Sequence, residues 1–221
     1  MSFKANDSLT EQIAQHLGKL IIQGTLAPAE RIQELRIATE LDVSRGSVRE
    51  ALLILQRRHL VEIYPRRGAV VASLTQEDVR AFFELWFLLL NRAATNLALS
   101  WKNDDLAHFF ALEAELAEHK LHADFNAFFD TSFIFLQTLY DFAGNRYLED
   151  ALNNLQPVTQ RCLYAIFRSG DMQLERAQCF ISDLLKAIIA RDLARLDAVT
   201  QHLSNTYRAL VQEATATLAK A

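Results

Sequence analysis

Apolar residues recur every three or four positions along most of this chain, a spacing that predicts helices. The first such segment, SLTEQIAQHLGKLIIQ, offers Ser8 or Thr10 as its N-cap and ends before Gly24. Two more helices are predicted in IQELRIATELD and SRGSVREALLILQRRH, separated by a very short break. The residues predicted to face inward are Ile32, Leu35, Ala38 and Leu41 in the former and Val48, Leu52 and Leu55 in the latter. Two short helices joined by a tight turn, the second rich in Arg, form a helix-turn-helix pattern.

The period of the pattern changes after the third predicted helix. The segment LVEIYPRRGAVVASL alternates in polarity and carries β-branched residues on both sides of PRRG. It predicts two short strands joined by a turn that contains Arg66, Arg67 and Gly68. A hairpin in this place is the wing of a winged helix, and Gly68 is free to adopt a positive φ at its tip.

From Thr75 onward the pattern is helical almost without interruption. A capped and strongly apolar helix follows Thr75, and further helices are predicted at residues 104–121, 124–141, 147–167, 171–190 and 192–218. About six helices of this length, joined by short loops, predict an antiparallel bundle. The expected fold is therefore mostly α, with a winged helix-turn-helix domain at residues 1–75 and an all-helical domain at residues 76–221.

Charge is divided unevenly between these two predicted domains. The first 75 residues contain 10 Lys and Arg against 8 Asp and Glu, whereas the remainder contains 13 against 19. Between residues 43 and 67, six Arg stand against two Glu. This local excess of positive charge, in a chain of net charge −4, favours an anionic partner for the first domain.

The arginines at the start of the third predicted helix suit the recognition of DNA bases. Arg45 and Arg49 are four residues apart and project from one face, and a recognition helix enters the major groove by its first turns. Arg forks onto O6 and N7 of guanine, while hydroxyls and helix N-termini suit phosphates. The alternative is that both arginines are surface charges, one of them paired with Glu40 or Glu50. The predicted DNA-binding residues are Ser44, Arg45, Ser47, Arg49, Arg66, Arg67 and Gly68.

The stretch DVSRGSVREALLILQRRHLVEIYPRRGAVV resembles the DNA-binding domain of GntR-type transcription regulators. The resemblance implies that Arg45 and Arg49 contact DNA and that Gly68 is the wing glycine. Two positions depart from the family pattern. His59 replaces the usual Gly at the end of the recognition helix, so a non-Gly residue must end that helix. Leu35 stands where some members have an Arg that contacts DNA. Arg31 and Arg36 are the candidates to make that contact in this chain.

The second domain resembles FCD, the ligand-sensing domain of the FadR-like branch of that family. The resemblance lies in FFELWFLLLNRAA, FFDTSFIFLQTLYDFAGNRYL and LLKAIIARDLARLDAVTQHL. Many FCD domains hold a divalent metal with one Asp and three His. Asp130 and His202 match two of these ligands, but Ile134 and Ile181 stand at the other two positions. Two ligands are too few for a stable site, so we expect neither a metal nor another cofactor.

Other substitutions at family positions favour an apolar effector. The family often has an Arg and a Glu on the first helix of this domain, where this chain has Trp86 and Leu90. Apolar walls suit a fatty acyl chain or an acyl-CoA. Arg161 and Tyr164, with Arg168 on the same helix face, are candidates for the polar end of such a pocket, and surface ion pairing is the alternative. The many aromatic residues equally suit a filled core or a dimer interface in a domain that has lost its sensor.

Several classes of protein are disfavoured. Cys162 and Cys179 and the scattered histidines form no catalytic set, and no glycine-rich phosphate loop is present, so we expect no enzyme and no catalytic residues. The polar N-terminus does not resemble a signal peptide, and AFFELWFLLL is too short to span a bilayer. Two cysteines without a framework fit a reducing compartment, so a cytoplasmic protein is expected.

These observations predict a cytoplasmic, homodimeric transcription regulator of GntR type that binds a pseudo-palindromic operator in double-stranded DNA. A small effector in the helical domain, apolar or acyl in nature and bound without metal, is expected to modulate DNA affinity. The alternatives are a DNA-binding dimer without an effector and a regulator that responds to a metal or carboxylate. An enzyme built on the helical domain is the least favoured alternative, and no membrane partner is expected.

Overall fold

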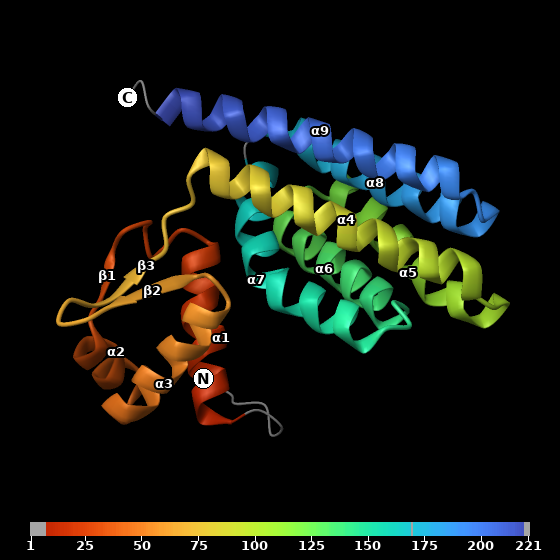
Figure 1. Cartoon of the computed structure of the whole chain (residues 1–221). Coiled ribbons are helices and arrows are strands. Elements are labelled where there is room, and N and C mark those ends of the chain that lie inside the picture. Colours follow the sequence, from red (N-terminus) through yellow and green to blue (C-terminus); the bar gives the residue numbers. More distant parts are fainter. Residues whose placement is uncertain (1–7, 169, 219–221) are drawn as a thin grey trace. The chain divides into compact units, whose positions relative to one another are not determined.

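Figure 1 shows a computed structural model of the chain, which describes residues 8–168 and 170–218. Contacts among these residues divide them into two compact units. The first unit holds the described residues up to Leu74 together with Asn154–Tyr164, and the second holds Thr75–Asn153 with the described residues from Ala165 onward. The main division thus falls between Leu74 and Thr75, and one later segment groups with the earlier residues.

The first unit is a winged helix-turn-helix. Its elements are α1 (Leu9–Ile22), β1 (Arg31–Ile32), α2 (Glu34–Leu41), α3 (Arg45–Arg57), β2 (Val61–Tyr64) and β3 (Gly68–Val71). Both β1 and β2 pair antiparallel with β3, so the strand order of the small sheet is β1-β3-β2. The predicted helix pair and wing hairpin are confirmed. The strand β1 was not predicted, because two residues are too few to show alternation.

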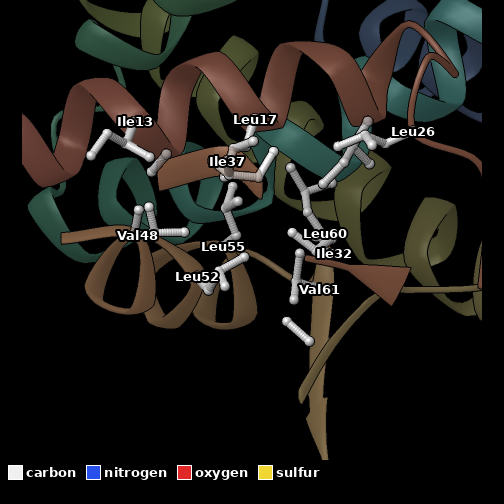
Figure 2. Close-up of a cluster of buried hydrophobic side chains, with 14 of the residues drawn as sticks. Ile13, Leu17, Leu26, Ile32, Ile37, Val48, Leu52, Leu55, Leu60 and Val61 are labelled. Atoms are coloured by element: carbon white, nitrogen blue, oxygen red, sulfur yellow. The ribbon is translucent and has the colours of Figure 1, made fainter. Parts of the chain in front are cut away.

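The apolar residues of the three helices meet the inner face of the sheet in one core, part of which is drawn in Figure 2. The buried residues include Ile13, Leu17, Ile32, Ile37, Val48, Leu52, Leu55, Leu60 and Val61. At Gly18 of α1 an added Cβ would lie 3.5 Å from a methyl group of Leu55 and 3.6 Å from one of Leu60, so α1 packs closely on the end of α3. This packing fixes the recognition helix relative to the sheet.

Two predictions for the second helix were wrong. Ile32 is buried, but it belongs to β1, where it pairs with Ala69. Leu35 is 69% exposed and faces away from the core. The reason is that α2 begins only at Glu34, after a residue that makes no side-chain cap, so its inward face is formed by Ile37 and Ala38.

The recognition helix ends at a histidine in the left-handed conformation, as the substitution at that position required. His59 has a φ of 57°, and its N–H donates to the carbonyl of Gln56. The next N–H, that of Leu60, donates to the carbonyl of Leu55, and both leucine side chains are buried in the same core. This is a Schellman ending with its usual apolar contact. A non-Gly residue holds it with strain.

The second unit is built from a bundle of helices, and six helices follow Thr75 in the described chain, as predicted. They are α4 (Gln76–Ser100), α5 (Asn103–Leu121), α6 (Phe125–Asp141), α7 (Arg146–Phe167), α8 (Asp171–Ala190) and α9 (Leu193–Leu218). A capping box starts α4, where Thr75 Oγ1 accepts from the N–H of Asp78 at 3.1 Å and Asp78 accepts from the N–H of Thr75 at 2.9 Å. The helix α4 packs against α8 and α9, and α5 packs against α6 and α8.

The core of this unit is strongly aromatic. Phe83, Trp86, Phe109, Phe128 and Phe135 are fully buried. Inside it the indole N–H of Trp86 donates to the hydroxyl of Tyr140 at 3.1 Å, which satisfies the buried indole N–H. Among the described residues, no helix is long and apolar enough to cross a membrane.

Candidate nucleic-acid interface

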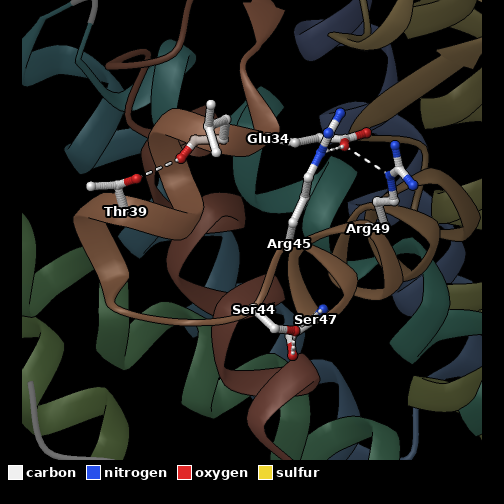
Figure 3. A network of polar contacts seen from close by, with 7 residues as sticks. Glu34, Thr39, Ser44, Arg45, Ser47 and Arg49 are labelled. Atoms are coloured by element: carbon white, nitrogen blue, oxygen red, sulfur yellow. Dashed lines mark hydrogen bonds and ion pairs between the residues drawn. The ribbon is translucent and has the colours of Figure 1, made fainter.

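The N-terminus of α3 is held by a serine cap. Ser44 Oγ accepts from the backbone N–H of Ser47 at 3.0 Å, and the two hydroxyls lie 2.8 Å apart (Figure 3). The cap fixes the first turn of the helix at the surface and leaves further N–H groups of that turn for an anion. Ser44 is exposed and Ser47 is partly buried, so the hydroxyl of Ser44 is the more accessible of the two to a phosphate.

Two arginines on the first turns of α3 converge on one carboxylate. Arg45 Nε donates to Glu34 Oε2 at 2.9 Å, and Arg49 Nε donates to the same oxygen at 2.8 Å (Figure 3). The arginine side chains are 57% and 60% exposed, whereas that of Glu34 is only 17% exposed. The predicted common face of Arg45 and Arg49 is confirmed.

The acidic partner was not predicted. Sequence proximity favoured Glu40 or Glu50, but Glu40 pairs with Arg36 at 3.4 Å on the outside of α2. Glu34 comes within reach only through the crossing of α2 and α3, and its start-of-helix position carries no local signal for this role. Burial raises the pKa of Glu34, but the two hydrogen bonds and the positive charges of both arginines outweigh it and bring the pKa below its ordinary value.

The wing tip adopts the conformation that its sequence predicts. Gly68 has a φ of 81° and Arg66 a φ of 65°, and the N–H of Arg67 closes the turn on the carbonyl of Tyr64 at 3.2 Å. Arg66 and Arg67 are exposed. The hydroxyl of Tyr64 donates to Glu62, and this bond and the charge of Glu62 raise the pKa of Tyr64.

A hollow of about 550 Å³ lies between the recognition helix and the wing. Four arginines line it, from β1, from α3 and from the wing: Arg31, Arg45, Arg49 and Arg66. Gly68 lies at the wing side of the hollow and Glu34 lies near the arginines of α3. Of the two substitutes considered for the missing family arginine, Arg31 lines this hollow and Arg36 is engaged by Glu40. The arrangement is a positively charged recess beside a recognition helix.

The arginines at the other end of α3 have a different environment. Arg58 Nη2 lies 2.8 Å from Glu11 Oε1 of α1, and its side chain is partly buried. This ion pair ties the end of α3 to α1 within the first unit. Arg58 therefore supports the packing of the recognition helix rather than its contact surface.

The positions predicted for an effector site lie in two different environments. Trp86, Leu90 and Ile181 are buried in the second unit. The remaining three of the family positions, Asp130, Ile134 and His202, are exposed. Within residues 8–168 and 170–218, no group of three His, Cys, Asp or Glu side chains could hold a metal ion.

The two polar residues predicted on α7 are both buried. Arg161 Nη1 donates to the carbonyl of Ala72 at 2.7 Å, a bond between two residues of the first unit, and burial lowers the pKa of Arg161. Tyr164 is also buried. Burial raises the pKa of the neighbouring Cys162 thiol to about 12, which favours the protonated thiol at neutral pH.

Two family models match the chain. The model described as "Bacterial regulatory proteins, gntR family" matches residues 9–71, which span the winged helix-turn-helix. The model described as "FCD domain" matches residues 81–205, more than half of the chain. The matches coincide with the two resemblances that the sequence motifs indicated.

Curated relatives carry both regions. The HTH-type transcriptional regulator YdhC of Bacillus subtilis is 30% identical over 74% of this chain and 73% of its own length. The HTH-type transcriptional repressor RspR of Escherichia coli is 27% identical over 93% of this chain and 91% of its own length. The gluconate operon transcriptional repressor of Bacillus subtilis is 27% identical over 67% of this chain and 61% of its own length.

Solved structures share the fold. McbR/YncC of Escherichia coli superposes with a TM-score of 0.79 at 20% identity, covering 95% of this chain and 99% of that one. A putative GntR regulator of Rhodococcus superposes with a TM-score of 0.74 at 21% identity, covering 94% and 99%. Together with the family matches, the arginine-bearing recognition helix and the wing, this establishes that the chain belongs to the GntR family of DNA-binding transcription regulators and carries an FCD domain.

Proposed function

We propose that the chain is a homodimeric repressor that reads guanine-containing half-sites with Arg45 and Arg49 and responds to an effector in its FCD domain. The observation that carries the proposal is the pair of exposed guanidinium groups on the first turns of α3, beside a wing with two more arginines. A major groove admits these turns, and an Arg fork matches O6 and N7 of guanine.

The other predicted contacts have supporting roles in this proposal. The hydroxyls of Ser44 and Ser47 and the N-terminus of α3 bind a backbone phosphate. Arg66 and Arg67 at the wing tip bind the adjacent backbone, where Gly68 allows close approach. Contacts of the wing add affinity for any sequence, while Arg45 and Arg49 add base preference.

The division of labour follows the two family regions. Residues 1–75 form the DNA-binding domain, and residues 76–221 form the effector-binding and dimerisation domain. Support for a second copy comes from α4, where Leu85, Leu88 and Leu99 share one face and are about half exposed or more. A two-fold symmetric dimer presents two recognition helices and therefore binds a pseudo-palindromic operator in the cytoplasm.

The effector is apolar or acyl in this proposal, and it binds without metal. Support comes from Ile134 and Ile181 at two family ligand positions and from the buried Trp86 and Leu90 on α4. Asp130 and His202, which are exposed in the same unit, are the polar family positions that remain for such a site. An effector changes DNA affinity only to the extent that it prefers one arrangement of the dimer.

The names of two relatives favour repression. RspR of Escherichia coli and the gluconate operon protein of Bacillus subtilis are both named as repressors.

The test combines a binding assay with native mass spectrometry. A duplex selected from a random pool by the wild-type chain serves as the probe in gel-shift titrations. We expect a dimer-to-duplex stoichiometry and, for protein purified from cells, an added mass that matches an acyl ligand. A monomeric complex would overturn the dimer, and an added mass equal to a metal ion would overturn the apolar effector. The effector-independent alternative would be favoured if the protein carried no added mass and its DNA affinity were unchanged by acyl-CoA.

A further inference from the structure

An acidic side chain lies among the arginines that line the recess between α3 and the wing. Glu34 lines the hollow between α3 and the wing together with Arg31, Arg45, Arg49 and Arg66. A carboxylate at a surface for DNA repels phosphates and lowers affinity for every sequence. Its presence there therefore calls for a compensating role.

We propose that Glu34 is a positioning residue for base recognition, which fixes Arg45 and Arg49 in orientation and raises sequence discrimination at the expense of general DNA affinity. The proposal rests on the proposed function of both arginines as base readers. Glu34 itself touches no base in this account, since its side chain is only 17% exposed and is occupied by the arginines.

The atoms involved carry the argument. Glu34 Oε2 accepts from Nε of Arg45 at 2.9 Å and from Nε of Arg49 at 2.8 Å. The fork that matches O6 and N7 of guanine is formed by the two terminal amino groups of an arginine, at the end of the guanidinium. Because each bond to Glu34 uses Nε at the side of the group, the end-on fork of each arginine is left for a base.

Orientation matters because arginine is a long and flexible side chain. A free guanidinium samples many rotamers, and ordering it on DNA opposes binding. The two bonds to Glu34 order both groups before DNA arrives, and the low exposure of the carboxylate fixes the point that they share. A guanidinium held in one orientation forms both hydrogen bonds to one base and fewer to other bases. A guanidinium that is free to rotate can bind a phosphate instead.

The negative charge of Glu34 is the reason for the expected cost in general DNA affinity. Three charges meet at this point, two positive and one negative, so removal of the carboxylate raises the local net charge by one. The pKa of Glu34 lies below its ordinary value because the arginine hydrogen bonds and charges outweigh the effect of burial. The carboxylate is therefore ionised under all conditions in which DNA binding is measured near neutral pH.

The test uses Glu34→Gln, which keeps the size of the side chain, in the full-length chain. Its matched control is Glu40→Gln, which also removes one acidic charge from α2. Glu40 pairs with Arg36 and does not line the recess. Binding to the selected duplex, to each single-base variant of it and to an unrelated duplex is measured by fluorescence anisotropy at several salt concentrations. The thermal midpoint of each variant is measured in parallel.

We expect E34Q to reduce the ratio of selected to unrelated duplex affinity roughly tenfold, with the loss concentrated at the base pairs that Arg45 and Arg49 read. Affinity for unrelated DNA rises a few-fold and becomes more salt-dependent. A merely structural role would instead lower affinity for the selected and the unrelated duplex together and leave their ratio unchanged. E40Q keeps the wild-type ratio.

Either of two results overturns the proposal. One is an E34Q ratio within about twofold of wild type, and the other is an equal loss in E40Q. These outcomes differ from failure of the proposed function, in which R45A and R49A themselves leave base preference unchanged. If E34Q lowers the thermal midpoint, Glu34→Asp, which keeps the charge on a shorter arm, must still show the loss of base preference.

Discussion

The first turns of α3 and the middle of α6 both carry residues that a family pattern singles out, but their surroundings differ. On α3, a serine cap and a shared carboxylate hold Ser47, Arg45 and Arg49 at the surface. On α6, Asp130 and Ile134 are exposed one turn apart, while other positions of the same family set are buried on α4 and α8. A DNA-binding surface is made from local features of one helix and one turn. An effector site is made from several helices, and sequence patterns do not give the positions of these helices relative to one another.

The largest expected effect is on the stability of the second unit, between a buried and an exposed phenylalanine. Phe109 is fully buried with its ring centroid 5.3 Å from that of Phe135, whereas the adjacent Phe110 is about half exposed. We expect Phe109→Ala to lower the free energy of unfolding of this unit by about 4 kcal/mol. Phe110→Ala is the control and should change it by less than about 0.5 kcal/mol. Chemical denaturation measures both, and equal effects would show that the described core is wrong.

The next effect is on DNA binding by the first unit. Arg45→Ala is expected to cost about 1–3 kcal/mol of operator-binding free energy and to relax base preference. Arg67→Ala on the wing should weaken selected and unrelated duplexes alike and reduce the salt slope by about one. Titrations by anisotropy at several salt concentrations distinguish the two patterns. If both variants behave alike, the helix and the wing do not divide their work as proposed.

The caps of α3 and α4 allow the same bond to be removed in both units. Ser44 Oγ and Thr75 Oγ1 each accept from a backbone N–H, at 3.0 and 3.1 Å. Ser44→Ala and Thr75→Ala should each lower the free energy of unfolding by about 1 kcal/mol. Only the former is expected to weaken DNA binding as well, because its cap orders the turn that carries Arg45. Loss of DNA affinity in Thr75→Ala to the same degree would contradict this separation.

The smallest expected effects concern two helices that end in the left-handed conformation. His59 after α3 and Arg191 after α8 have φ values of 57° and 53°. His59→Gly should raise the free energy of unfolding by about 0.5–1 kcal/mol, since Gly adopts this conformation without strain. Arg191→Gly should lower it, because Arg191 also covers the ring of Trp101 at 4.6 Å and donates to two carbonyls. Thermal unfolding of each variant measures whether its stability rises or falls.

Much of the fold follows from the sequence because its signals are local. Helical spacing, caps and the Pro/Gly turn predicted the helix pair, the wing and the helices after Thr75. Leu35 and Ile32 show the limit, since a two-residue strand interrupts the helical pattern that their spacing predicted. The strand is formed only by pairing with β3, which lies about forty residues further along the chain.

The candidate site shows the same limit. Arg45, Arg49 and Gly68 were identified from their spacing and family pattern, but Glu34 was not, because its bond to Arg49 joins residues 15 positions apart. Arg161 was predicted at the polar end of a pocket, and the structure shows its guanidinium bonded to the carbonyl of Ala72. Helix-face arguments place a side chain on a side of a helix, but they do not identify the neighbour on that side.

The central claim is that the first turns of α3 read DNA bases, and parallel selections from one random pool of duplexes test it most directly. The wild-type chain and the Arg45→Ala, Arg49→Ala double variant are each taken through selection and sequencing. We expect the wild type to enrich a two-fold symmetric sequence with guanines in each half-site, and the double variant to enrich no such guanines. Enrichment of the same sequence by both proteins would contradict the account.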